Sequence, residues 1–208
     1  MSSEGIGLLL LGWLLGLLAP QISEGIRRRR RRARIKDAIY TEVAELGTKM
    51  ALTVLKVEGT LAPWTKDLVN WTHVSLVGCG VSRSIEMQQV LSQMLNSEDE
   101  VFDAMAQARR AKPGTALGVK GQRLPYIDSA IGELDVFEEV TRGSILELRG
   151  QVEQFNELVE DARMFYRMTF DVTGSNHAVV SSNLNESYCD IAKKGRVVVQ
   201  RVLSILPN

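Results

Sequence analysis

The side chains that could do chemistry are few and widely separated. The chain has two cysteines, Cys79 and Cys189, and two histidines, His73 and His177. Neither histidine has a second histidine or a glutamate at the spacing that would let one helix bind a metal, which excludes a di-iron helical bundle. The cysteines are expected to be reduced, buried, small apolar side chains. A catalytic cysteine–histidine pair remains open, because it requires only that the fold brings the two residues together.

Two other stretches could bind or activate a ligand. The glycine-rich segment 114–121 lacks the spacing of a phosphate-binding loop and follows no expected strand, so it is interpreted as a flexible connection. Ten acids lie between Asp128 and Asp161, against Arg142 and Arg149. Paired carboxylates can do acid–base chemistry, but their spacing here matches the solvated side of a helix. We therefore predict no enzyme activity, no catalytic residue, no cofactor and no metal site.

The most specific motif is a run of basic residues near the N-terminus. Eight of the 25 Lys and Arg residues lie between Arg27 and Lys36, with no acid among them. The net charge of the chain is zero, so the rest carries 17 basic and 25 acidic residues, a net of −8. Anionic lipid headgroups are the expected ligand. The alternatives are that the run only fixes membrane topology, or that it binds nucleic acid, which the acidic remainder disfavours. The predicted lipid contacts are Arg27, Arg28, Arg29, Arg30, Arg31, Arg32, Arg34 and Lys36.

An apolar segment precedes the arginines. The fifteen residues from Gly5 to Ala19 include no polar or charged side chain. With the basic run behind them, they predict a transmembrane anchor over residues 5–26. Residues 1–4 would then form a short extracytoplasmic N-terminus, residues 27–36 a juxtamembrane segment and the rest a cytoplasmic domain, in a single-pass protein of a bacterial inner membrane.

Two alternatives to the anchor remain open. A cleaved signal peptide is disfavoured because the N-terminus lacks a basic residue and Pro20 follows the best cleavage point. A buried core helix is disfavoured by the arginines. The opposite orientation would be indicated if the glycosylation-type triplets at Asn70 and Asn185 were lumenal. Self-association of the anchor is also predicted, because Gly5, Gly12 and Gly16 leave one side of a helix without side chains.

Helical periodicity dominates residues 37–208. Hydrophobic residues recur at spacings of three and four in four long stretches, and nothing in the chain reads as a strand. We therefore predict an all-α fold: a single N-terminal transmembrane helix followed by an antiparallel bundle of four main helices and one short helix, with a mobile loop at 112–124. Ser97–Glu100 is interpreted as a capping box that starts the short helix, and Gly143 as a bend or a break. The clearest predicted seams are Ile39, Val43, Leu46, Met50, Thr53 and Val57, then Ile145, Leu148, Val152, Phe155, Val159, Ala162 and Tyr166.

The composition is that of a globular chain, with 45% hydrophobic and 24% charged residues, which excludes wholesale disorder. The predicted function is a membrane-anchored helical interaction or scaffold protein with an unidentified protein partner, assembled as a homo-oligomer. The alternative is a membrane-tethered effector or sensor whose bundle repacks when it binds a ligand or a partner. Glycines within the helical patterns favour that alternative, and they are Gly78, Gly80, Gly143, Gly150 and Gly195.

Overall fold

The computed structural model describes residues 3–109 and 117–207, with the side chains of 3–12, 14, 15, 17–20 and 175 left out. Every element in these residues is a helix and none is a strand, which confirms the predicted all-α class. The α-helices are α1 (Ser3–Leu61), α2 (Lys66–Cys79), α3 (Ile85–Leu95), α4 (Asp99–Ala108), α5 (Pro125–Ser129), α6 (Glu139–Asp171) and α7 (Ser175–Ile205). Two short 3₁₀ helices are η1 (Ser82–Ser84) and η2 (Ile131–Val136).

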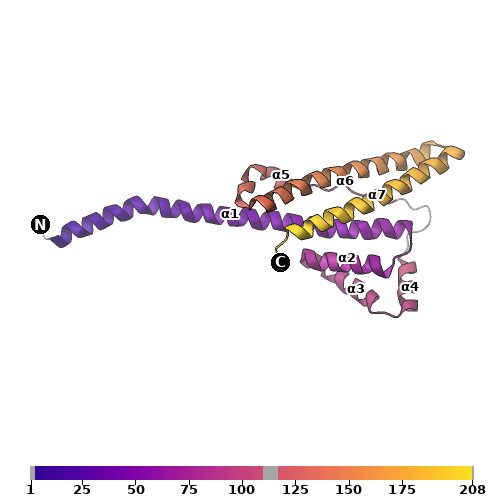
Figure 1. The fold of residues 1–208 in the computed structure, drawn as a ribbon, viewed down its shortest axis with the longest axis horizontal. Coiled ribbons are helices and arrows are strands. Elements are labelled where there is room, and N and C mark those ends of the chain that lie inside the picture. The colour runs from indigo at the N-terminus through magenta and orange to yellow at the C-terminus, as the bar shows by residue number, and fades with distance from the viewer. Residues whose placement is uncertain (1–2, 110–116, 208) are drawn as a thin grey trace.

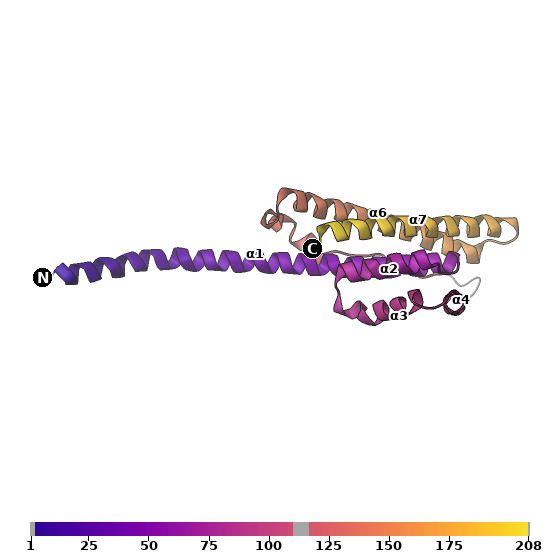
Figure 2. The same ribbon diagram turned by 60° about the horizontal axis from the view of Figure 1, so that its bottom comes forward.

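Three long helices organise the bundle. In Figure 1, α7 runs antiparallel to both α1 and α6 and packs against both. The hairpin-like pair α2 and α3 covers another side of α1, and α4 packs against α3. The N-terminal part of α1 leaves the bundle and projects alone, as both Figure 1 and Figure 2 show. The chain exposes 13403 Å², whereas a compact monomer of this length would expose about 9,700 Å², and the projecting helix is the visible source of that difference.

The predicted membrane anchor is wrong. Among the described residues no helix is long and apolar enough to cross a membrane. Fifteen apolar residues in a helix rise only about 22 Å, less than the roughly 30 Å of a hydrocarbon core. The helix also does not end with the apolar segment, because α1 continues without interruption through Pro20 and the arginines to Leu61. The transmembrane helix over 5–26, the signal-anchor interpretation and the single-pass location are corrected accordingly.

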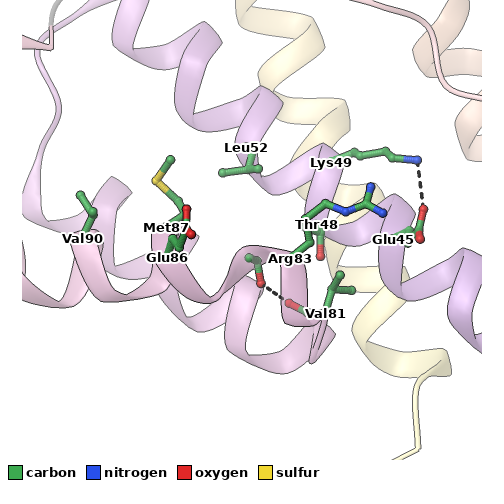
Figure 3. Close-up of a pocket in the computed structure, with 10 residues that line it drawn as sticks. Glu45, Thr48, Lys49, Leu52, Val81, Arg83, Glu86, Met87 and Val90 are labelled. Carbon is green, nitrogen blue, oxygen red and sulfur yellow. Dashed lines mark hydrogen bonds and ion pairs between the residues drawn. The ribbon is translucent and has the colours of Figure 1, made fainter.

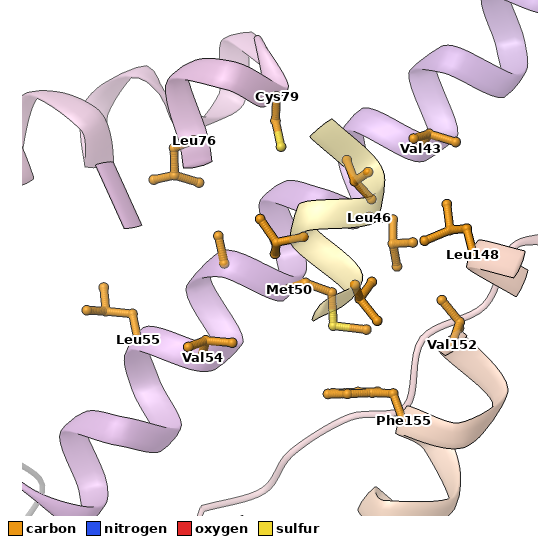
Figure 4. Close-up of a cluster of buried hydrophobic side chains, with 14 of the residues drawn as sticks. Val43, Leu46, Met50, Val54, Leu55, Leu76, Cys79, Leu148, Val152 and Phe155 are labelled. Atoms are coloured by element: carbon orange, nitrogen blue, oxygen red, sulfur yellow. The ribbon is translucent and has the colours of Figure 1, made fainter. Parts of the chain in front are cut away.

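The core lies where α1, α6 and α7 meet (Figure 4). The α1 seam is buried as predicted except at Thr53, whose hydroxyl donates to the Lys49 carbonyl while Val54 is buried instead. This shift of one residue occurs because a helix turns every 3.6 residues and drifts from a strict seven-residue repeat. The α6 seam is buried from Ile145 to Ala162, but Tyr166 is 40% exposed.

Helix boundaries differ from the prediction in three places. The sequence pattern predicts one helix from near Pro63 to Asn96, but it is broken at Gly80. The φ of Gly80 is 64°, the left-handed conformation that glycine adopts readily, and the chain turns through η1 into α3. No capping box forms at Ser97, because α4 is capped by Glu98 without a side-chain hydrogen bond, and the Ser97 hydroxyl donates to the Met94 carbonyl at 2.7 Å. Gly143 lies inside the continuous α6, so the break before this helix falls at Glu138 instead.

The connection before α5 is held against the bundle in its described part. The backbone of Leu117 both donates to and accepts from the Tyr188 hydroxyl at 3.0 Å. The Asn156 amide pairs with both backbone groups of Gln122, at 2.7 and 2.8 Å. Val119 is also buried. Side chains of α6 and α7 therefore fix residues 117–124, while 112–116 of the predicted mobile loop lie outside the described residues.

Candidate functional site

The arginine run lies on the part of α1 that projects from the bundle. Every residue from Gln21 to Arg34 is exposed, and the bundle begins at Ile35, which is 6% exposed. Successive residues of an α-helix are rotated by about 100°, so six consecutive arginines surround the helix instead of forming one face. Any side of this segment therefore presents at least two guanidinium groups, and the next turn adds Arg34.

Few acids neutralise this segment. Among the ion pairs of the described residues, Arg28 pairs with Glu24 one turn earlier, and Arg31 pairs with Glu133 of η2 at 2.9 Å. The hydrogen bond and charge of the Glu133 carboxylate raise the pKa of the Arg31 guanidinium above its ordinary value. The other exposed arginines of the run have no acidic partner among these pairs, so most of the positive charge faces solvent.

The base of the projecting helix is braced by α5 and η2. Lys36 is half-buried, with its ammonium 5.5 Å from the centre of the Phe137 ring, and that ring meets Tyr40 edge to face at 5.5 Å. The Glu42 carboxylate accepts from the backbone N–H groups of Tyr126 and Ile127 at 2.9 and 2.8 Å. These bonds cap the start of α5, where backbone donors lack helical partners. Lys36 thus belongs to the junction, and Arg31 is tied to it through Glu133, unlike the other six arginines.

The glycines predicted to mediate transmembrane self-association are described only in part. A Cβ atom built on Gly16 would contact nothing within 4 Å. The surroundings of Gly5 and Gly12 lie outside the described side chains. Elsewhere on the projecting helix, Trp13 is 65% and Ile22 58% exposed. The transmembrane setting of this prediction is wrong, and α1 retains exposed apolar side chains beside the basic run.

The two cysteines lie on different helices and in different surroundings. Cys79 is buried in α2, Cys189 is exposed on α7, and both thiols are free. Burial raises the pKa of the Cys79 thiol to about 11, and the neighbouring Thr48 hydroxyl opposes this only in part. A protonated thiol is a poor nucleophile. Within the described residues, no group of three or more His, Cys, Asp or Glu side chains could hold a metal ion.

The acidic stretch between Asp128 and Asp161 makes surface ion pairs. Arg149 contacts Asp128 at 2.7 Å and Glu153 at 3.1 Å, and Arg201 contacts Glu147. All of these carboxylates are at least half exposed. The carboxylates are therefore paired with arginines on the solvated side of the bundle.

Some aromatic residues hold helices of the bundle together, and others are exposed on its surface. The Arg196 guanidinium lies 4.2 Å from the centre of the Trp71 ring and binds both oxygens of Glu58 at 2.7 and 2.8 Å, which joins α1, α2 and α7. Near the end of α6, Tyr166 and Phe170 meet edge to face, and Phe170 is 73% exposed. The end of the α6–α7 pair therefore carries an exposed aromatic patch.

Sequence reasoning missed a groove between α1 and the start of α3. It has a volume of about 400 Å³ and includes Thr48 and Leu52 of α1, Arg83 of η1, and Met87 and Val90 of α3. No sequence pattern marks it, since its residues come from segments up to 45 positions apart and none belongs to a motif. Comparison with protein-family models, curated proteins and solved structures finds no match, so the geometry of the chain itself carries the functional argument.

Proposed function

We propose that this chain is a non-catalytic helical interaction protein that binds anionic lipid headgroups through the arginines of α1 and offers its bundle to a protein partner. The observation that carries the proposal is the exposure of the whole arginine run on a helix that projects from the bundle. A basic residue close to an anionic leaflet gains about 1 kcal/mol. Because guanidinium groups surround the helix, several reach a flat surface in any orientation.

The charge distribution supports a surface ligand over a nucleic acid. Outside the run the chain carries a net charge of −8, which repels a long polyanion that wraps around the protein. The arginine segment also has no interleaved aromatic side chains on which bases could stack. A lipid surface meets only the projecting helix and leaves the acidic bundle at a distance.

The close packing of the bundle supports a role as a rigid scaffold that offers its surface to a protein partner. The long helices share one continuous core, and of the five glycines that favour repacking, Gly78 and Gly195 lie at close contacts, whereas Gly80, Gly143 and Gly150 face open space. A Cβ atom on Gly195 would approach Val54 Cγ2 to 2.6 Å, and one on Gly78 would approach Leu203 Cδ2 to 2.7 Å. Such contacts favour one fixed packing. A scaffold with a rigid bundle is therefore preferred over a sensor whose bundle repacks.

The exposed apolar side chains of α1 support contact with a further molecule. Trp13, Ile22 and Ile26 are 47% or more exposed. A second copy of the chain that packs along α1 would cover them, which retains self-association as part of the proposal without a transmembrane setting. The exposed patch around Phe170 is a separate surface at the opposite end of the molecule, available to a protein partner.

Vesicle flotation tests the proposal. The full chain is expected to float with vesicles that contain phosphatidylserine, to float poorly with phosphatidylcholine vesicles, and to be released as salt shortens the screening length from roughly 10 Å at 0.1 M to 3 Å at 1 M. Changing Arg27 through Arg32 to glutamine should abolish the preference for anionic vesicles. Equal flotation with both vesicle types, or tighter binding to an equal charge of nucleic acid, would refute the assignment.

A further inference from the structure

We propose that the groove between α1 and α3 binds a small amphipathic anion, an alkyl chain with a carboxylate head. The groove lies beside the turn from α2 through η1 to α3 (Figure 3). Its volume of about 400 Å³ falls in the range of small-molecule sites, roughly 300–1,000 Å³. The site is unrelated to the arginine run of α1 and does not depend on lipid binding there.

Aliphatic side chains form most of the groove. Leu52 of α1, Val81 before η1, and Met87 and Val90 of α3 all line it. Leu52, Val81 and Met87 are half-buried and pack on the edge of the main core. An alkyl chain in the groove would therefore extend the core and remove apolar surface from water, the usual driving force for such a ligand.

The strongest indication of a ligand is the hydroxyl of Thr48. Four other helical threonines of the chain donate to the carbonyl one turn earlier at 2.7 or 2.8 Å. Thr48 is 8% exposed, and its Oγ1 has no oxygen or nitrogen hydrogen-bond partner among the described residues; its one polar neighbour is the Cys79 thiol, whose pKa it lowers slightly. A buried hydroxyl without a partner is costly, and Thr48 is one of the residues that line the groove, with its Oγ1 covered until a ligand moves the side chain. A carboxylate oxygen would accept a hydrogen bond from it.

The charges around the groove determine which end of it the carboxylate of the ligand would occupy. Lys49 is paired with Glu45 at 3.4 Å, whereas Arg83 forms no ion pair within the described residues. Figure 3 shows Arg83 reaching from η1 toward α1 beside Thr48, with Glu86 on the other side next to Met87. A carboxylate is therefore attracted to the Arg83 end and repelled from the Glu86 end, so the alkyl chain would extend toward Val90.

The walls of the groove are held in place without a ligand. The Gln88 side chain donates to the Leu76 carbonyl at 3.1 Å and to the Ser84 hydroxyl at 2.8 Å. Ser84 in turn donates to the Val81 carbonyl at 2.7 Å. These bonds lock α3 onto α2, so the groove is preformed, which lowers the ordering cost of binding.

Methyl NMR on the full chain with ¹³C-labelled methionine, titrated with decanoate, tests the proposal. Met87 lies in the groove, while Met164 and Met168 near the end of α6 are exposed and report on non-specific binding. Decanoate should shift the Met87 methyl in a saturable manner and leave the other two unchanged. Decanol and decyltrimethylammonium, which have the same chain but no negative charge, should bind at least about threefold more weakly.

Matched variants separate the polar contacts from folding. Thr48→Val keeps the shape of the side chain and should weaken decanoate binding by about threefold to tenfold, whereas Thr53→Val, whose hydroxyl is already bonded to Lys49, should not. Arg83→Gln should weaken binding by about threefold, and Arg123→Gln on the bundle surface should leave it unchanged. Both groove variants should melt close to the wild-type temperature, because Arg83 forms no ion pair among the described residues and the Thr48 hydroxyl contacts only the weakly polar Cys79 thiol.

Three results would overturn the proposal. The first is a Met87 methyl that does not move. The second is a shift of Met164 and Met168 in parallel with Met87, which would indicate non-specific adsorption of the alkyl chain. The third is equal affinity for decanol and decanoate, or unchanged affinity in Thr48→Val and Arg83→Gln, which would leave no role for the carboxylate.

Discussion

Gly47 of α1 lies where both α2 and α7 pack closely against it, and the change Gly47→Ala tests that packing. A Cβ atom there would lie 2.6 Å from both Cys79 Sγ and Val202 Cγ1. Val202 is fully buried and its β-branched side chain has few alternative rotamers, so it cannot move aside easily. The added methyl group must therefore push α1 away from two helices at once.

The size of the effect follows from two opposing terms. Inserting a methyl group into a packed core lowers the free energy of unfolding by about 1–3 kcal/mol. Replacing glycine by alanine inside a helix raises the free energy of unfolding by about 1 kcal/mol. With contacts on two sides the upper part of the first range applies, so Gly47→Ala should lower the free energy of unfolding by about 1–2 kcal/mol. For a chain of this size that corresponds to a fall in Tm of about 2–8 °C.

Gly150 of α6 provides the matched control. A Cβ atom built on Gly150 would contact nothing within 4 Å. Gly150→Ala should therefore gain helix propensity without a clash and raise Tm by about 2–4 °C. Calorimetry on both variants gives the comparison. A Gly47→Ala chain that melts at or above the wild-type temperature would refute the packing described for α1, α2 and α7.

Two further substitutions and one labelling experiment probe contacts that the sequence does not reveal. Glu42→Ala removes the two hydrogen bonds that cap the start of α5 and should destabilise the fold by about 1–2 kcal/mol. The urea midpoint of unfolding should fall, and an unchanged midpoint would contradict the cap. Tyr188→Phe should accelerate hydrogen exchange at the Leu117 amide by about fivefold or more, and unchanged exchange would show that the hydroxyl does not hold this segment. Burial holds the Cys79 pKa at about 11, above the ordinary 9.0, so the protonated thiol stabilises the folded state below pH 9.0 and this contribution is lost as pH rises toward about 11. At pH 8 iodoacetamide should modify exposed Cys189 well before Cys79, and equal rates by mass spectrometry would contradict this burial.

Local periodicity was sufficient to predict the helices and most of the core. The seam from Ile145 to Ala162 was predicted residue by residue and is buried, because a long amphipathic helix has one apolar side whatever it packs against. Hydrophobic periodicity failed to predict burial where the neighbouring helices determine which side chains are covered. Thr53 belongs to the predicted α1 seam but is only half-buried, whereas its neighbour Val54 is 1% exposed.

The groove and the close helix contacts depend on segments far apart in the chain, so local sequence patterns do not predict them. Thr48 resembles the other helical threonines until η1 and α3 are placed beside it. Gly47 lies within the first seam and carries no signal of its three-helix contact. The apolar run from Gly5 to Ala19 misled the prediction because its composition and flanking charge are typical of an anchor, whereas the run is too short to cross a membrane and the helix continues beyond it.

The central claim is that the arginines of α1 act as a local binding site and not through the overall charge of the chain. Two triple variants with the same net charge test it most directly. Arg29→Gln, Arg30→Gln and Arg32→Gln together remove exposed arginines without an acidic partner, and the change of Arg123, Arg142 and Arg167 to glutamine removes three exposed arginines from the bundle.

Equilibrium binding of both triple variants to phosphatidylserine vesicles at 0.1 M salt is the measurement. The account predicts that the α1 variant binds about ten- to a hundredfold more weakly than the wild type, with the bundle variant close to the wild type. Equal loss in the two variants, or no loss in the α1 variant, would contradict a binding site on the arginine run.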